Sequence, residues 1–240
     1  MDELIMKIRL DKYLADMSIG TRSEVKKLIS KGSVTVNDIK IKKPETKIDT
    51  KKDMVICQGT DVSYKEFEYY MLNKPQGVIS ATEDINQSTV LDLIDSRRKD
   101  LFPVGRLDKD TEGLLLITND GQLCHSLLAP GKHVDKVYYA RIDGVVTEKD
   151  VKAFEDGLDI GDDKLALPGY LKILKSDNIS EIELTIHEGR FHQVKRMFKA
   201  VGKEVIYLKR LSMGNLTLDS DLKPGEYKEL KKDEIDRYVK

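Results

Sequence analysis

Residues 102–116 read Phe-Pro-Val-Gly-Arg-Leu-Asp-Lys-Asp-Thr-Glu-Gly-Leu-Leu-Leu, a polar stretch with two glycines that runs directly into an apolar strand. The expected strand, residues 114–118, is followed by a turn at residues 119–121. Catalytic side chains often lie on loops held by such rigid elements. Asp108 and Asp110 are therefore candidate functional carboxylates, although the residues alone are also compatible with simple capping of the turn.

The sequence around this loop predicts an α+β domain. Strands are expected at residues 68–75, 136–142 and 182–186, and helices at 90–93, 121–128, 148–156 and 192–200. Residues 216–227 read as a strand, a turn and a second strand that closes the sheet. Because strands outnumber helices without a regular βαβ rhythm, we expect a mostly antiparallel mixed sheet flanked by helices.

The first 60 residues have the pattern of a separate small module. Apolar spacing predicts a helix at 10–17, and Thr21 with Glu24 has the form of a capping box that opens a second helix. Gly32 is expected to end that helix, and short strands are expected at 33–37 and 54–57. We therefore predict domains at 1–60 and 68–240, joined by a linker at 61–67.

Charge is distributed unevenly along the 240 residues, although the net charge is only −1. Residues 7–52 hold 13 Lys or Arg against six Asp or Glu, and residues 190–210 hold seven against one. Two basic segments on a nearly neutral chain indicate a polyanionic partner, although a charge run is more often just a solvated face.

Several other classes of protein are disfavoured. No stretch approaches the roughly 20 apolar residues of a membrane span, and residues 1–5 lack the pattern of a secretory signal. Cys57 and Cys124 are far apart and fit two thiols in a reducing cytoplasm. Four histidines without a cysteine partner do not predict a metal site, and no glycine-rich phosphate loop predicts a nucleotide cofactor. We expect neither metal nor cofactor.

Two resemblances to known families follow from ordered motifs. Residues 9–14, 21–25 and 32–37 resemble the S4 RNA-binding domain. Gly105-Arg106-Leu107-Asp108 with residues 110–115 resembles the signature motif of the pseudouridine synthases. Residues 71–77, Lys136-Val137-Tyr138 and residues 188–197 are similar to three further motifs of the RsuA-type branch, in which an S4 domain precedes the catalytic domain.

This resemblance implies roles for individual residues. Asp108 corresponds to the essential aspartate, Tyr138 to the active-site tyrosine, and Arg190 to a basic residue expected to pair with Asp108. Arg106 is expected to fill the space that the flipped uridine leaves, or to hold its phosphate. The remaining RNA contacts are expected to be Arg9, Arg22, Ser23, Lys26, Lys27, Lys74, His192, Gln193, Lys195 and Arg196.

The expected reaction is the isomerisation of one uridine to pseudouridine, with Asp108 either attacking C1′ or assisting a glycal route. The motifs and the tail are most similar to enzymes of the branch that modify 16S rRNA, which implies the equivalent of uridine 516 as the target. A target in 23S rRNA is the alternative within the branch, and a non-catalytic S4 assembly factor is the alternative outside it. We expect a cytoplasmic monomer that does not associate with membranes. Its expected partner is ribosomal RNA within an assembling small subunit.

Overall fold

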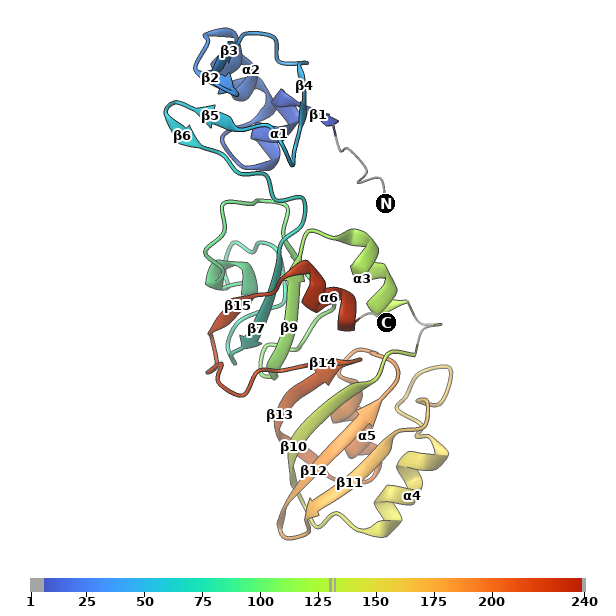
Figure 1. Cartoon of the computed structure of the whole chain (residues 1–240). Coiled ribbons are helices and arrows are strands. Elements are labelled where there is room, and N and C mark those ends of the chain that lie inside the picture. The colour runs from blue at the N-terminus through green and yellow to red at the C-terminus, as the bar shows by residue number, and fades with distance from the viewer. Residues whose placement is uncertain (1–6, 130, 132, 239–240) are drawn as a thin grey trace. The chain divides into compact units, whose positions relative to one another are not determined.

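A computed structural model describes residues 7–129, 131 and 133–238, so the segment examined for a signal lies outside the described residues. The chain divides into two compact units (Figure 1). The first comprises residues up to Phe67 together with Asp95–Asp100, and the second comprises Glu68–Ile94 and the chain from Leu101 onward.

The first unit is built on two short helices, α1 (Leu10–Asp16) and α2 (Arg22–Ser30). The predicted capping box is confirmed, since Thr21 Oγ1 accepts from the backbone of Glu24 and the Glu24 carboxylate accepts from the backbone of Thr21. Gly32 follows the helix at φ +76°, the left-handed conformation expected at this end. The helices pack with the sheets through a core that includes Leu10, Val25 and Ile29.

Small strands complete this unit. One sheet has the order β3-β2-β5-β6 and a second pairs β1 with β4. Their bounds are β1 Lys7–Arg9, β2 Val34–Val36, β3 Ile39–Ile41, β4 Lys47–Asp49, β5 Val55–Cys57 and β6 Thr60–Asp61. The residues predicted as a linker continue the unit instead, because Val62 is buried in its core and its carbonyl accepts a hydrogen bond from Tyr13 Oη.

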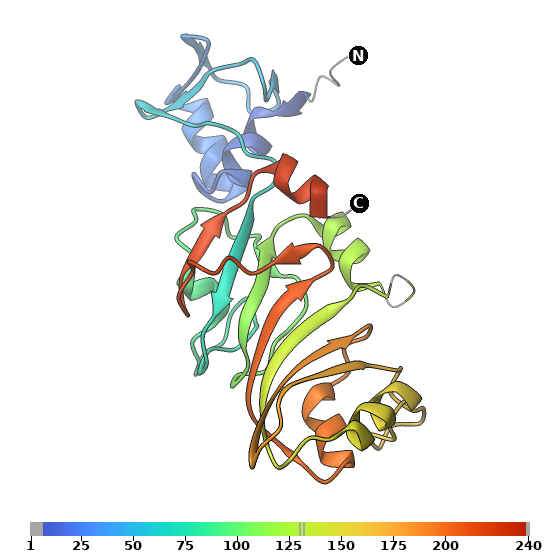
Figure 2. The same ribbon diagram turned by 60° about the horizontal axis from the view of Figure 1, so that its bottom comes forward.

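The second unit contains a curved sheet with the strand order β11-β12-β10-β13-β9-β7-β15, with β8 paired to β9 and β14 to β13 (Figures 1 and 2). Every pairing is antiparallel except β9 with β13, which confirms the predicted sheet type. The strands are β7 Tyr69–Lys74, β8 Phe102–Pro103, β9 Glu112–Thr118, β10 Lys136–Asp143, β11 Tyr170–Lys175, β12 Ile179–Ile186, β13 Glu204–Met213, β14 Leu216–Thr217 and β15 Tyr227–Glu229.

Helices cover both faces of this sheet, which explains two kinds of strand sequence. They are η1 (Val90–Leu93, a 3₁₀ turn), α3 (Gly121–Leu128), α4 (Glu148–Asp156), α5 (Gln193–Ala200) and α6 (Lys232–Tyr238). One core includes Phe154 of α4 and Phe198 of α5, and the other packs α3 and α6 against β7 and β9. Strands β7 and β9 contribute to both cores and are buried along nearly their whole length, with apolar runs at their centres, whereas burial alternates along β10 and β12. The four predicted helices are confirmed; β8, β11, β13 and α6 were not predicted.

The two halves of the sheet meet at a short parallel joint. Glu112 and Gly113 of β9 lie opposite Lys209 and Arg210 of β13. Gly113 has φ +103°, and a Cβ there would stand 2.7 Å from the backbone nitrogen of Arg210 and closer still to its carbonyl oxygen. Because Arg210 also lies opposite Tyr138 of β10, one row of residues crosses three strands.

Replacing Gly113 with alanine should destabilise the second unit by about 3 kcal/mol or more, because the positive φ and the backbone overlap both oppose a side chain. The urea midpoint of unfolding measures this. Gly121→Ala is the matched control: it lies at the start of α3 with open space around its Cβ, and should be neutral or stabilising by about 0.5–1 kcal/mol. Equal midpoints for the two variants would contradict the assignment of strain to the joint.

Candidate active site

The loop that carries Asp108 is fixed by its own backbone. Ser80 Oγ donates to the carbonyl of Leu107 at 2.8 Å and accepts from the Leu107 amide at 3.0 Å. The amide of Thr111 donates to the carbonyl of Asp108, which closes a turn, and the amide of Gly77 donates to the carbonyl of Lys109. The Asp108 backbone is therefore held while its side chain remains 26% exposed.

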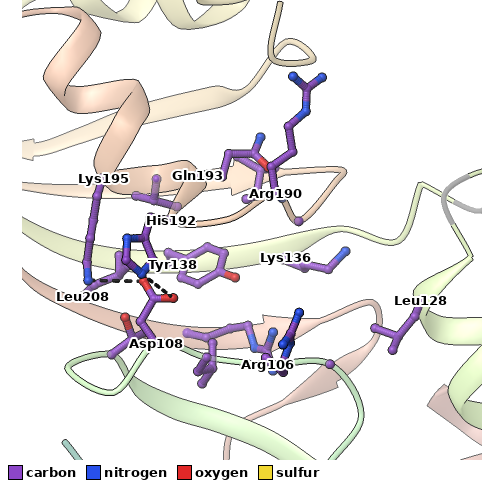
Figure 3. A pocket seen from close by; sticks show the side chains of 17 residues that line it. Arg106, Asp108, Leu128, Lys136, Tyr138, Arg190, His192, Gln193, Lys195 and Leu208 are labelled. Carbon is purple, nitrogen blue, oxygen red and sulfur yellow. Dashed lines mark hydrogen bonds and ion pairs between the residues drawn. The ribbon is translucent and has the colours of Figure 1, made fainter. Parts of the chain in front are cut away.

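Two basic side chains from the region of α5 face the Asp108 carboxylate (Figure 3). Lys195 Nζ lies 3.2 Å from Oδ2, and His192 Nε2 lies 3.5 Å from Oδ1. Lys195 also donates to Asp110 at 2.6 Å. Burial opposes the charge of Lys195, but the bonds to Asp110 and Asp108 outweigh it and raise the pKa of the ammonium. Lys195 therefore remains a cation at neutral pH, between two carboxylates.

These groups open onto a pocket, here named the Asp108 pocket, which also contains Tyr138 of β10 and the apolar side chains Ile186 and Leu208. Tyr138 lies in the middle of it, between the Asp108 end and Lys136 (Figure 3). An ionic end and an apolar, aromatic middle suit a ligand that combines polar groups with a flat ring. Of the predicted site residues, Asp108, Tyr138, Arg106, Arg190, His192, Gln193 and Lys195 all line this pocket.

The predicted pairing of Arg190 with Asp108 is wrong. The guanidinium of Arg190 extends away from Asp108 (Figure 3), donates to Glu188 at 3.0 Å, and donates to the carbonyls of Lys164 and Leu165. Arg190 precedes α5, whereas Lys195 lies in its first turn and so reaches Asp108. The cation that pairs with Asp108 is therefore Lys195.

Two predicted RNA contacts are buried. Lys74 is 0% exposed, and its ammonium donates to the carbonyls of Pro75 and Thr111 at 2.9 Å and of Lys109 at 3.4 Å. Gln193 is also buried, accepting from the Arg190 amide and donating to Glu188. Both side chains form hydrogen bonds within the protein and are buried, so their assignment as RNA contacts was wrong.

The other predicted contacts differ in availability. Arg196 is partly exposed but donates to the carbonyl of Ile160 and pairs with Asp162. Arg106 is exposed at the Asp108 pocket, and no hydrogen bond or ion pair holds its guanidinium within the described residues. His192 has a left-handed backbone, φ +47°, and its ring stacks on Phe191 at 3.8 Å between centroids. A non-glycine residue in this conformation is uncommon and often marks a functional position.

In the first unit, the predicted contacts on α2 share one property: their side chains are exposed, and within the described residues no ion pair engages them. They are Arg22, Ser23, Lys26 and Lys27. Arg9 differs, because both ends of its guanidinium fork donate to Asp11, at 3.0 and 2.8 Å. The surface of α2 is the part of this unit most available to a polyanion.

Sequence reasoning overlooked Lys136 and Arg210, which line the Asp108 pocket although they are almost completely buried. Lys136 was part of a quoted motif without an assigned role, and Arg210 was counted only as charge. Lys136 could have been found from the sequence, because a basic residue two positions from Tyr138 on an alternating strand lies on the same face of the sheet. Over residues 7–129, 131 and 133–238, no cluster of His, Cys, Asp or Glu could hold a metal, and no helix there is long and apolar enough to cross a bilayer.

Comparisons with known proteins find matches for both units of the chain. The family model described as RNA pseudouridylate synthase matches residues 68–200, and the S4 domain model matches residues 8–55. The chain is 48% identical over 231 residues to the uncharacterized RNA pseudouridine synthase YtzG of Bacillus subtilis, covering 95% of this chain and 97% of that protein. A crystal structure of a pseudouridylate synthase matches with a TM-score of 0.68 at 35% identity, covering 97% and 99% of the two chains.

Two further relatives have assigned ribosomal subunits. Ribosomal small subunit pseudouridine synthase A of Vibrio cholerae is 40% identical over 230 residues, covering 95% of this chain and 98% of its own. Ribosomal large subunit pseudouridine synthase B of Bacillus subtilis is 38% identical over 233 residues, covering 95% and 94%. The chain therefore belongs to the RNA pseudouridine synthases, enzymes that isomerise uridine in RNA. It is a member of the branch in which an S4 domain precedes the synthase domain.

Replacing Lys195 with methionine should lower pseudouridine formation by about 100-fold or more, since a charged partner of the Asp108 carboxylate is lost inside the pocket. Rate constants under single-turnover conditions measure this. Lys152→Met is the matched control, because Lys152 also bridges two carboxylates, Glu155 and Asp156, but on the exposed side of α4. An unchanged rate constant for Lys195→Met would contradict the role of Lys195 as the charged partner of Asp108.

The buried ammonium of Lys74 predicts a dependence of stability on pH. Burial lowers the pKa of Lys74 from 10.5 to about 8, despite the opposing charges of Asp110, Asp108 and Glu112. Between pH 8 and 10.5 the unfolded chain therefore binds more protons at this residue than the folded chain. The free energy of unfolding of the wild type, relative to Lys74→Met, should rise across this window by up to about 3 kcal/mol. Urea unfolding at both ends of the window measures it, and parallel curves would contradict it.

Proposed function

We propose that this enzyme converts one uridine of 16S rRNA, the equivalent of uridine 516, to pseudouridine. The observation that carries the chemistry is the Asp108 carboxylate, held by its loop, with Lys195 at 3.2 Å and Tyr138 in the same pocket. The 40% identity to a small-subunit synthase along nearly the whole chain supports the target.

In this proposal Asp108 is the reacting carboxylate. The reaction breaks the N1–C1′ bond, turns the base within the pocket and joins C5 to C1′, after which C5 loses its proton and N1 gains one. Asp108 either forms an ester with C1′, which the attack of C5 later breaks, or removes a proton from C2′ on a glycal route and later returns it. Both routes require an ionised carboxylate, which the charge of Lys195 favours. No redox partner or energy source enters this balance.

The target base must leave its helix before C1′ and C5 can be reached. Tyr138 offers a ring face on which the flipped base stacks, and its hydroxyl is available for proton transfer. Arg106 is exposed at the pocket and has no ion-pair partner among the described residues, so it is suited to the vacated space or to the phosphate of the flipped nucleotide.

RNA affinity is assigned to the exposed side of α2, through Arg22, Ser23, Lys26 and Lys27. Such contacts neutralise phosphates without reading sequence. His192 is proposed to contact the RNA beside Asp108. Arg9 and Arg196 are proposed to contact the RNA only after they release their carboxylate partners, Asp11 and Asp162. We propose a cytoplasmic monomer that acts on the RNA of an assembling small subunit.

A target in 23S rRNA is the second candidate, since the large-subunit synthase is 38% identical over a comparable length. A non-catalytic S4 assembly factor is the third, which the arrangement around Asp108 disfavours.

Chemical mapping of pseudouridine in both rRNAs, from cells lacking the protein and from cells complemented with wild type or Asp108→Asn, tests the proposal. We expect one 16S position to lose pseudouridine in the deletion strain, to regain it with the wild type and to stay unmodified with Asp108→Asn. Loss at a 23S position instead would assign the enzyme to the large subunit. Restoration by Asp108→Asn would overturn the role of the carboxylate.

A further inference from the structure

Two positively charged side chains, here named the cationic wall, line the Asp108 pocket and have no acidic partner among the described residues. Lys136 of β10 is 8% exposed and Arg210 of β13 is 2% exposed. Lys136 Nζ donates to the carbonyl of Val134, and Arg210 Nε donates to the carbonyl of Leu114, both at 2.8 Å. Arg210 Nη2 is buried and has no hydrogen-bond partner. Within the part of the chain that the structure describes, no carboxylate forms an ion pair with either side chain.

The surroundings do not compensate these charges. Asp135 attracts Lys136, but its side chain is exposed and already bonds His187 Nδ1 at 2.7 Å. Burial and the neighbouring charge of Arg210 together lower the pKa of Lys136, so the two cations oppose each other. Buried charges without partners are costly and persist where function requires them. The wall is therefore prepared for negative charge that a ligand brings.

Lys136 lies at the opposite end of the Asp108 pocket from Lys195, and Arg210 lies beside Tyr138. Arg210 is the direct cross-strand partner of Tyr138, and Lys136 is two residues before Tyr138 on the same strand face. In Figure 3, Lys136 lies on the side of Tyr138 away from Asp108 and Lys195. A ligand that reaches Asp108 at one end and covers Tyr138 thus points its far edge at the wall.

We propose that Lys136 and Arg210 stabilise the negative charge that develops on the uracil ring when it separates from C1′. This inference rests on the proposed function of Asp108. As the N1–C1′ bond breaks, its electron pair leaves with N1 and spreads to O2 and O4, while the electron-poor sugar remains beside Asp108. Formation of the C5–C1′ bond returns an electron pair to the sugar carbon. C5 then gives up its proton and N1 gains one, so the atoms balance. The wall donates hydrogen bonds throughout and exchanges no atoms.

A phosphate of the RNA is the other source of negative charge, and burial argues against it. A phosphate is joined to nucleotides on both sides and stays near the mouth of a pocket, whereas the flipped base is the part that enters. The two ligands also differ in timing: a phosphate carries the same charge throughout, but the ring is neutral until the bond breaks. Charges that meet the ring raise the rate at saturating RNA, and charges that meet a phosphate tighten binding.

The test measures Lys136→Met with the rRNA that the wild type modifies, separating the single-turnover rate at saturating RNA from the dissociation constant. We expect the rate to fall by about 100-fold to 1000-fold and the dissociation constant to change by less than about twofold. The unfolding temperature should be unchanged or higher, because a buried unpaired charge has been removed. A purely structural lysine would instead lower the unfolding temperature.

Arg210→Met should show the same loss of rate with unchanged binding, and Lys136→Arg, which keeps the charge, should recover part of the rate. Lys172→Met is the matched control, since Lys172 is exposed on β11 of the same sheet and does not line the pocket. Weakened binding with a normal rate at saturation would assign the wall to a phosphate and overturn the proposal, as would a normal rate with normal binding. Failure of the proposed function would show separately, as no conversion by the wild type.

Discussion

The parallel contact between Gly113 and Arg210 is the constraint on which the pocket depends. It joins two halves of the sheet through only two residue pairs, and the backbones approach so closely there that position 113 has no room for a side chain. The joint brings β9, which begins four residues after Asp108, beside β13 and hence near Tyr138 of β10. Residues distant in sequence thus share one pocket because three strands are in register at one row.

Charge in the pocket follows two different rules. At the Asp108 end, each charge faces an opposite one: Lys195 lies between Asp108 and Asp110, with His192 near the other carboxylate oxygen. The buried ammonium of Lys74 donates to three carbonyls, and two of these belong to the loop that carries Asp108. Lys136 at the far end and Arg210 beside Tyr138 have no acidic partner among the residues that the structure describes. The paired charges fix the position of the Asp108 carboxylate. The uncompensated positive charges of Lys136 and Arg210 remain available to attract negative charge on a ligand.

Features that depend on neighbouring residues were predicted correctly from the sequence. Features that depend on contacts between segments distant in sequence were not. The capping box at Thr21, the helix end at Gly32 and the apolar runs of β7 and β9 depend on neighbouring residues and were predicted correctly. Strand β13 was missed because its polar residues Lys209 and Arg210 resemble a surface segment, and nothing nearby in sequence shows that β9 buries Arg210. Arg190 was assigned as the partner of Asp108 from the resemblance to a family motif. The carbonyls of Lys164 and Leu165 that hold its guanidinium instead lie about 25 residues away in sequence. Ordered motifs therefore located the site, and the fold assigned the partners within it.

The register of β13 against β10 has a consequence for sequence variation. The register between β13 and β10 shifts at two points, where Leu211 and Ile206 of β13 have no partner on β10. As a result, Arg210 lies opposite Tyr138, and Leu208 lies opposite Ala140. Since side chains alternate between faces, losing one of these extra residues would turn the following ones to the opposite side of the sheet. Insertions and deletions among homologues should thus be confined to connections such as residues 157–169, while the spacing from Leu208 to Met213 stays constant.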